Sequence, residues 1–150
     1  MSLNERSLVS IPEALPLPGG RWGGVLHQDV VTRLRRQHPN ILLIGPAAFA
    51  LEALNSIEPA VPQPIVSWRP SETPEVPSGS FRTLVIHRVD TADAEQQQKL
   101  CAWFDARPHH VQVVSTALAP LYPFVEQGTF LETLYYRLNH VCLVAERLQD

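Results

Sequence analysis

The sequence predicts a three-layer α/β domain in which five mainly parallel strands are flanked by helices. The chain has 150 residues, the size of one domain. Its apolar runs are short and uninterrupted, as in strands that are buried on both faces of a sheet. Stretches with helical spacing alternate with these runs, which is the order typical of a parallel sheet. The expected strands cover residues 41–44, 65–68, 83–86, 111–114 and 141–144.

Proline and glycine divide the chain into an arm and a domain. Residues 1–24 contain three prolines and end in two glycine pairs, which predicts an extended arm, and residues 25–150 form the domain. A second proline cluster predicts a loop over residues 69–80. Helical spacing predicts the connecting helices. These helices cover residues 25–37, 47–57, about 93–107, 121–127 and 130–138, and Asp90, Thr91 and Asp93 are the expected caps and first-turn acids of the third.

Composition excludes several functional classes. The net charge of -3 does not suit a nucleic-acid coat, which needs clustered basic residues. No apolar run reaches the ~20 residues of a membrane span and no secretory signal is visible, so we expect a soluble protein. Two cysteines, Cys101 and Cys142, suit core thiols in a reducing cytoplasm. Of the 12 basic residues only Lys99 is a lysine.

The first predicted strand leads into an altered phosphate-binding loop. A working loop reads G-x-x-x-x-G-K-[ST], in which backbone N–H groups wrap the phosphates and the lysine neutralises them. Here Gly45 matches the first glycine, whereas Ala50, Leu51 and Glu52 occupy the positions of the second glycine, the lysine and the hydroxyl. Lys99 cannot substitute, because it lies within a predicted helix.

Two further residues of this loop oppose phosphate binding. Pro46 lacks a backbone donor, and Phe49 is expected to place its ring where the phosphates would lie. Glu52 would repel them. The loop therefore has the outline of a nucleotide site without its chemistry.

The second half of the chain carries a more specific pattern. Gly128-Thr129-Phe130, followed by Leu134-Tyr135-Tyr136-Arg137-Leu138-Asn139, is close to G-x-F-R-x-D-L-Y-Y-R-L-N. That pattern, and the elements before it, resemble the AAA+ ATPase domain of sigma-54-dependent transcriptional activators, over residues 24–143. The resemblance implies a P-loop NTPase fold with AAA+ strand order. The strand over 83–86 is similar to the one that carries the family's magnesium-site acids, and residues 111–116 resemble its sensor strand.

This chain departs from the family at its catalytic positions. The acidic pair of the magnesium site falls on His87 and Arg88, and the sensor asparagine falls on Leu118. The first arginine finger falls on Leu131, and Arg137 matches the second. The loop over 69–80 lacks the G-A-F-T-G-A signature that engages the sigma factor, and no room is expected for the helical lid or the DNA-binding helix-turn-helix.

These departures predict a cytoplasmic, non-catalytic interaction protein of bacterial transcription control, a pseudo-ATPase with degenerate Walker motifs. ATP and Mg²⁺ binding are expected to be weak or absent, because phosphoryl transfer depends on cations that this chain has lost. The expected partner is an AAA+ activator or a signalling protein, without direct DNA or membrane contact, and the chain is expected to be a monomer or weak dimer. The alternative is a regulator that binds a nucleotide or small ligand at the carboxyl edge of the sheet. A structural relic is the third interpretation.

Several individual residues have more than one interpretation. Asp90 is either a displaced magnesium acid or a helix cap, and Arg88 either holds an anion or forms an ion pair at the strand end. His109 and His110 have no third ligand spaced nearby, so no metal site is predicted. A phosphoacceptor receiver fold is excluded, because no lysine follows the last strand.

The helix predicted over residues 130–138 offers a candidate interface. Its apolar residues recur every four positions and are expected to face the sheet. Arg137 lies on another face, and it either pairs with Glu132 or Asp150 or docks onto a partner. The candidate interface consists of Tyr136, Arg137 and Asn139.

Overall fold

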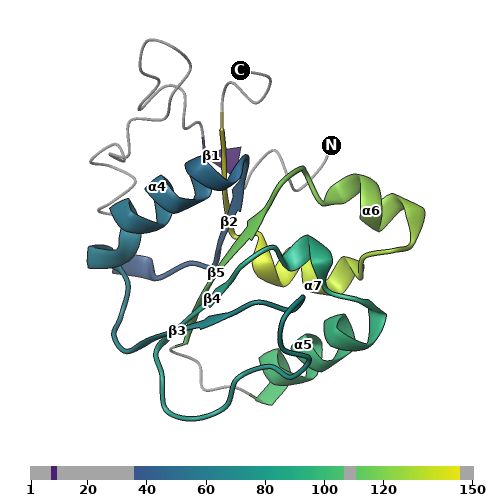
Figure 1. The fold of residues 1–150 in the computed structure, drawn as a ribbon, viewed down its shortest axis with the longest axis horizontal. Helices are drawn as coiled ribbons and strands as arrows, with labels where there is room; N and C mark the ends of the chain where they lie inside the picture. Colours follow the sequence, from purple (N-terminus) through teal and green to yellow (C-terminus); the bar gives the residue numbers. More distant parts are fainter. Residues whose placement is uncertain (1–7, 10–35, 107–110, 146–150) are drawn as a thin grey trace.

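The computed structural model describes residues 8–9, 36–106 and 111–145, which form a parallel sheet between two helical layers (Figure 1). The sheet order is β1-β6-β2-β5-β4-β3, and each pairing between these strands is parallel. The strands are β1 (Leu8–Val9), β2 (Ile41–Ile44), β3 (Ile65–Trp68), β4 (Thr83–Ile86), β5 (Gln112–Ala117) and β6 (Val141–Val144). The five predicted strands are confirmed, and β1 is an addition within the predicted arm.

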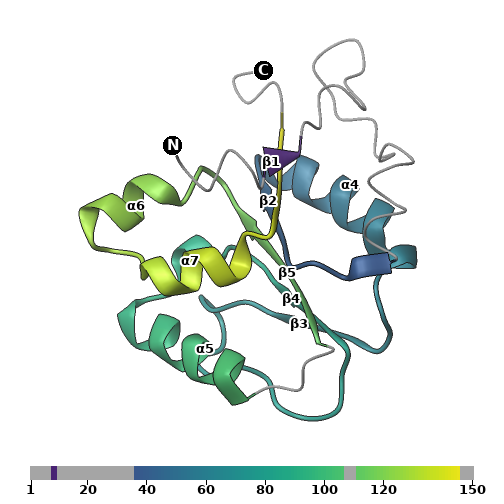
Figure 2. The same cartoon turned by 180° about the vertical axis from the view of Figure 1, so that it is seen from behind.

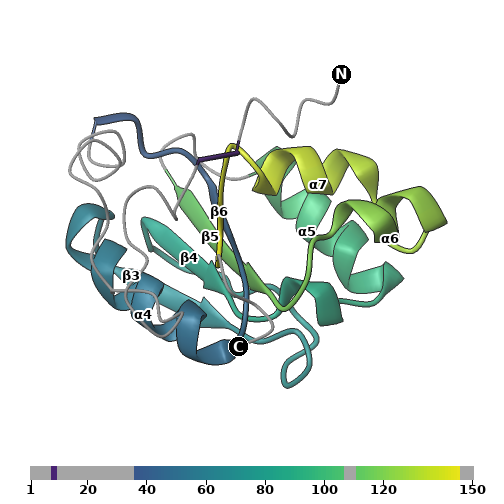
Figure 3. The same ribbon diagram turned by 90° about the horizontal axis from the view of Figure 1, so that it is seen from above.

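Helices cover both faces of the sheet (Figures 2 and 3). Helix α4 (Ala47–Ile57) packs on one face through Phe49, Ala53 and Ile57. Helices α5 (Ala94–Ala106), α6 (Tyr122–Gln127) and α7 (Glu132–Leu138) lie on the other. Each face therefore has its own apolar core, which confirms the three-layer α/β class. Residues 36 and 37 are helical, and the rest of the helix predicted over 25–37 lies outside the described residues.

The central strand β5 is longer than the sequence indicated. It spans Gln112–Ala117 and is buried throughout, although it contains three polar residues. Pairing with β2 on one side and β4 on the other satisfies its backbone. The prediction relied on continuous apolar runs, and it ended the strand at Val114 because the next two residues are polar.

Helix α5 begins at Ala94, and the residue that caps it is Asp93. Asp93 Oδ1 accepts a 2.8 Å hydrogen bond from Gln96 N, and Gln96 Oε1 accepts one of 3.0 Å from Asp93 N. This reciprocal pair is a capping box. Asp90 lies instead in the 3₁₀ turn η2 (Val89–Thr91), where its carboxylate binds Arg88. The prediction that Asp90 caps the helix is therefore wrong.

Two buried amides hold α7 against the rest of the domain. Asn40 Nδ2 donates to Arg137 O at 2.8 Å, and Asn40 Oδ1 accepts from Val113 N at 2.9 Å. Gln97 donates to Thr129 O at 3.1 Å and accepts from Leu131 N at 2.9 Å. Residues 128–139 are thus fixed by these partly buried hydrogen bonds as well as by their apolar stripe.

The two thiols are expected to differ in reactivity. Cys142 is buried in β6, and burial raises the pKa of its thiol to about 12, whereas Cys101 on α5 is half-buried. Since the thiolate is the reactive form, Ellman's reagent at pH 8 should modify only Cys101 in the native protein and both thiols in guanidinium. The variant Cys101→Ser should be unreactive until it is unfolded. Equal rates for both thiols in the native state would contradict this assignment.

Candidate site at the carboxyl edge of the sheet

A cavity of about 280 Å³ lies where the carboxyl ends of β2, β4 and β5 meet. Gly45 follows β2, His87 and Arg88 follow β4, and Leu118 follows β5, and all four residues line the cavity. From β2 the chain continues into α4 on one face, and from β5 it continues into α6 on the other (Figure 3). Such a divergence between adjacent strands opens a crevice in which parallel α/β folds bind ligands. The fold therefore brings together, around one cavity, four site residues that the sequence analysis named at separate positions in the chain.

The loop after β2 is shaped by close packing. Gly45 N donates to Ala117 O at 2.9 Å, and a Cβ added at Gly45 would lie 2.7 Å from both Ala145 Cβ and Phe49 Cδ2. Phe49 is only 5% exposed and belongs to the core beneath α4. The prediction that its ring blocks the phosphate position is therefore wrong. Gly45 is required by its neighbours and needs no nucleotide to explain it.

The wall that α4 contributes to the cavity is apolar. Ala50 and Leu51 line it, and so does Leu54, one turn further along the helix. Leu51 is 61% exposed, which is unusual for a large apolar side chain. Across the cavity Leu118 is 45% exposed. Glu52 is half-buried on α4 and does not line the cavity.

Arg88 is held at the end of β4 by two partners. It adopts a left-handed backbone with φ of 59°, and its N–H donates to Thr116 Oγ1 at 2.8 Å. Its guanidinium donates to both carboxylate oxygens of Asp90 at 3.0 Å, and this hydrogen bond raises the pKa of Arg88. The structure thus shows the ion-paired alternative that the sequence left open.

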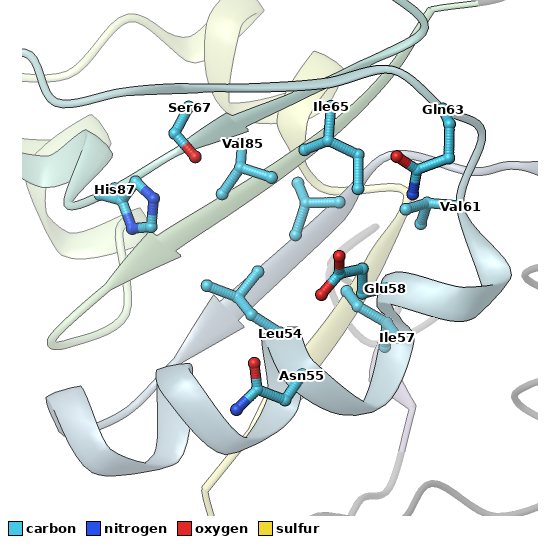
Figure 4. Close-up of a pocket in the computed structure, with 11 residues that line it drawn as sticks. Leu54, Asn55, Ile57, Glu58, Val61, Gln63, Ile65, Ser67, Val85 and His87 are labelled. Atoms are coloured by element: carbon cyan, nitrogen blue, oxygen red, sulfur yellow. The ribbon is translucent and has the colours of Figure 1, made fainter.

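His87 lines this cavity and also a second one of about 370 Å³, which Figure 4 shows. The second cavity is bounded by the end of α4, by β3 and by β4, with Val85 and Ile65 on its sheet side. Burial lowers the pKa of His87, and the charge of Arg69 lowers it further, while Glu72 acts in the opposite direction. The imidazole is therefore mainly neutral at pH 7.

A pH-dependent stability is expected from His87. Its pKa is depressed in the folded state, so the unfolded chain binds more protons below the ordinary value of 6.5. The stability that the neutral imidazole contributes is fully present above that pH and is lost as the pH falls. Urea unfolding between pH 7.5 and 5 should show a smaller loss of stability in His87→Gln than in the wild type. Identical pH dependence in the two proteins would contradict the assignment.

Two cavity residues escaped sequence reasoning. Arg69 directly follows β3, and Thr116 lies within β5. Parallel strands end at the same edge of a sheet, so the position of Arg69 directly after β3 could have identified it as a residue of the site. Thr116 belongs to the segment that resembles the sensor strand, but the apolar run ends before it and did not indicate that its side chain lines the cavity.

The side chain of Arg137 contacts residues of α5. Its Nη2 lies 2.6 Å from Asp105 Oδ1, its Nη1 donates to Cys101 O at 3.2 Å, and its guanidinium carbon stands 5.7 Å from the centre of the Phe104 ring. The predicted partner Glu132 is therefore replaced by Asp105, and Asp150 lies outside the described residues.

The rest of the candidate interface is only partly on the surface. Asn139 is 7% exposed and donates to Tyr135 Oη at 3.0 Å, so its inclusion as a surface contact is wrong. Tyr136 is half-buried. The accessible part of the predicted interface consists of Tyr136 and Arg137.

Other features of the described residues offer no second chemical centre. Lys99 lies within α5 as expected, with Nζ 2.7 Å from Glu75 and 3.4 Å from Glu95. The described part of the chain contains no cluster of three His, Cys, Asp or Glu residues suited to a metal, and His109 and His110 fall outside it. None of the described helices is long and apolar enough to cross a membrane.

The strand order of the five long strands, β6-β2-β5-β4-β3, and the crevice beside the β2 loop describe an α/β fold of the kind found in AAA+ P-loop NTPases. No protein-family model matches the sequence, and a search of curated proteins found no match. Among solved structures the fold is similar to that of NtrX from Brucella abortus.

Two NtrX structures illustrate this similarity. The complex with ATP has a TM-score of 0.58 and 20% identity, and the complex with ADP has a TM-score of 0.56 and 18% identity. In both comparisons 79% of this chain is covered, and the chain spans 34% of the length of NtrX. At this identity the comparison establishes the fold.

Proposed function

We propose that the chain is a non-catalytic relative of sigma-54 activator domains that acts in bacterial transcription control through a protein partner. The observation that carries this proposal is the lining of the cavity beside the β2 loop. Leu51, which the sequence resemblance aligns with the phosphate-binding lysine, lines this cavity, and so does Leu118, which it aligns with the sensor asparagine. Cytoplasmic location and a monomeric or weakly dimeric state belong to the same proposal.

The missing charges account for the proposed loss of ATPase activity. Phosphoryl transfer depends on cations that position the phosphates and neutralise the developing charge. Each charge-assisted hydrogen bond contributes about 1.5–3 kcal/mol, so loss of the lysine and the magnesium ligands removes most of the affinity for phosphates. Lys99 cannot compensate, because it lies on α5 and is paired there with Glu75 of the β3–β4 loop.

The partner proposal is tested with an ATP-hydrolysing AAA+ activator domain from the same bacterium. We expect the purified chain to bind it saturably and to change its ATPase rate at least about twofold. Absence of both effects would reject an activator as partner.

Matched variants locate the contact surface. Arg137→Ala removes the cation, whereas Asp105→Asn removes the ion pair and leaves the cation in place. Docking through Arg137 requires loss of binding in Arg137→Ala and Tyr136→Ala but not in Asp105→Asn. Binding that survives Arg137→Ala combined with Tyr136→Ala would place the contact elsewhere.

A regulator that binds a small ligand is the second candidate. It is favoured by Arg69, which lines the cavity and forms no ion pair with any described residue. Unlike Arg88, its charge is available to a ligand.

A further inference from the structure

The cavity beside the β2 loop combines a large apolar wall with one available cation. Leu51, Leu54 and Leu118 supply the apolar surface, and two of them are more than one third exposed. An exposed leucine on each side of a crevice means that apolar surface faces water at the position where such folds bind ligands. A polar or polyanionic ligand would leave this surface unused.

The two arginines of the cavity differ in their partners. Arg88 is bound at 3.0 Å by Asp90, which compensates its charge. Arg69 has no carboxylate partner among the described residues, and its field reaches the cavity, because it lowers the pKa of His87. One uncompensated positive charge therefore faces the apolar wall.

The size of the cavity further restricts the ligand. Its volume of about 280 Å³ lies just below the range of roughly 300–1,000 Å³ that is usual for ligand pockets. The polar groups beside Arg69 are few: the His87 imidazole and the Thr116 hydroxyl, which already accepts from Arg88 N. Arg69, His87 and Thr116 can together orient one charged group, but they are too few to bind a triphosphate.

We propose that this cavity binds a small organic monoanion with an apolar body, of the aromatic or medium-chain carboxylate class. The carboxylate pairs with Arg69, and the apolar body packs between Leu51 and Leu54 of α4 and Leu118 of the β5–α6 connection. This inference rests on the ligand-binding candidate above and specifies its ligand. Arginine suits the role because its planar fork matches a carboxylate.

The test is calorimetric titration of the full chain with naphthalene-2-carboxylate and with octanoate, beside the neutral naphthalene-2-carboxamide. We expect saturable binding of at least one carboxylate with Kd below about 1 mM, and binding of the amide at least about tenfold weaker. Arg69→Gln should weaken carboxylate binding at least about tenfold. Leu51→Gln, at an exposed position, should weaken it about threefold or more.

The matched control is Arg82→Gln, which removes the same charge at the opposite end of the sheet, directly before β4. It should leave the affinity within about twofold. The inference is overturned if neither carboxylate binds saturably, if the amide binds equally well, or if Arg69→Gln has no more effect than Arg82→Gln. ATP hydrolysis is measured on the same samples: hydrolysis would overturn the proposed function, whereas absent carboxylate binding without hydrolysis overturns only this inference.

Discussion

Gly45→Val is expected to destabilise the folded protein by about 2–3 kcal/mol or more. Its Cβ would lie 2.7 Å from Ala145 Cβ and from Phe49 Cδ2. Ala145 cannot retreat, because its N–H donates to Ile44 O at 2.9 Å and its methyl group has no rotamer to change. Overpacking of a filled core costs about 1–3 kcal/mol, and here two neighbours are displaced at once.

Urea unfolding followed by circular dichroism measures this change. Ala48→Val adds the same branched side chain on the exposed face of α4 and serves as the matched control, with an expected cost below about 1 kcal/mol. Equal costs at the two positions would contradict the packing explanation for Gly45.

Asn40→Ala is expected to cost about 2–4 kcal/mol. The amide is 3% exposed and links the Arg137 carbonyl to the Val113 N–H, so its removal takes the side-chain partner from one buried and one partly buried backbone group. Each such group costs about 1–3 kcal/mol. Because Asn40 precedes β2 and contacts both β5 and α7, the change should also lower the cooperativity with which α7 unfolds.

Denaturant unfolding of Asn40→Ala is compared with Asn55→Ala, the same substitution at an exposed position of α4. The control should lie within about 0.5 kcal/mol of the wild type. A cost below about 1 kcal/mol for Asn40→Ala would show that water replaces both hydrogen bonds.

Much of the fold was predictable from short-range patterns. The run over residues 41–44 and the helix over residues 47–57 occur where the sequence placed them, because continuous apolar strands and Ala/Leu-rich helices leave clear signals. The position of the site was also predictable, since the carboxyl ends of parallel strands share an edge. That geometry brings His87, Arg88 and Leu118 to the Gly45 loop.

The orientations of individual side chains were harder to predict. Phe49 was placed in the phosphate position by analogy with the loop, yet its spacing with Ala53 and Ile57 puts all three on one helical face, which was a usable signal. Asn139 follows the last residue of α7, and its side chain folds back onto the same helix, where it donates to Tyr135 Oη one turn earlier. Asp90 and Asp93 were equivalent as caps until the backbone placed Asp90 beside Arg88.

The central proposal is that this chain combines an AAA+-like fold with a loss of ATPase chemistry. The most direct test is calorimetric titration of the purified chain with Mg-ATP, combined with an assay of phosphate release. We predict no saturable heat up to millimolar nucleotide and no release above the buffer rate. Micromolar binding that Leu51→Glu abolishes, or phosphate release that the same change removes, would contradict the account.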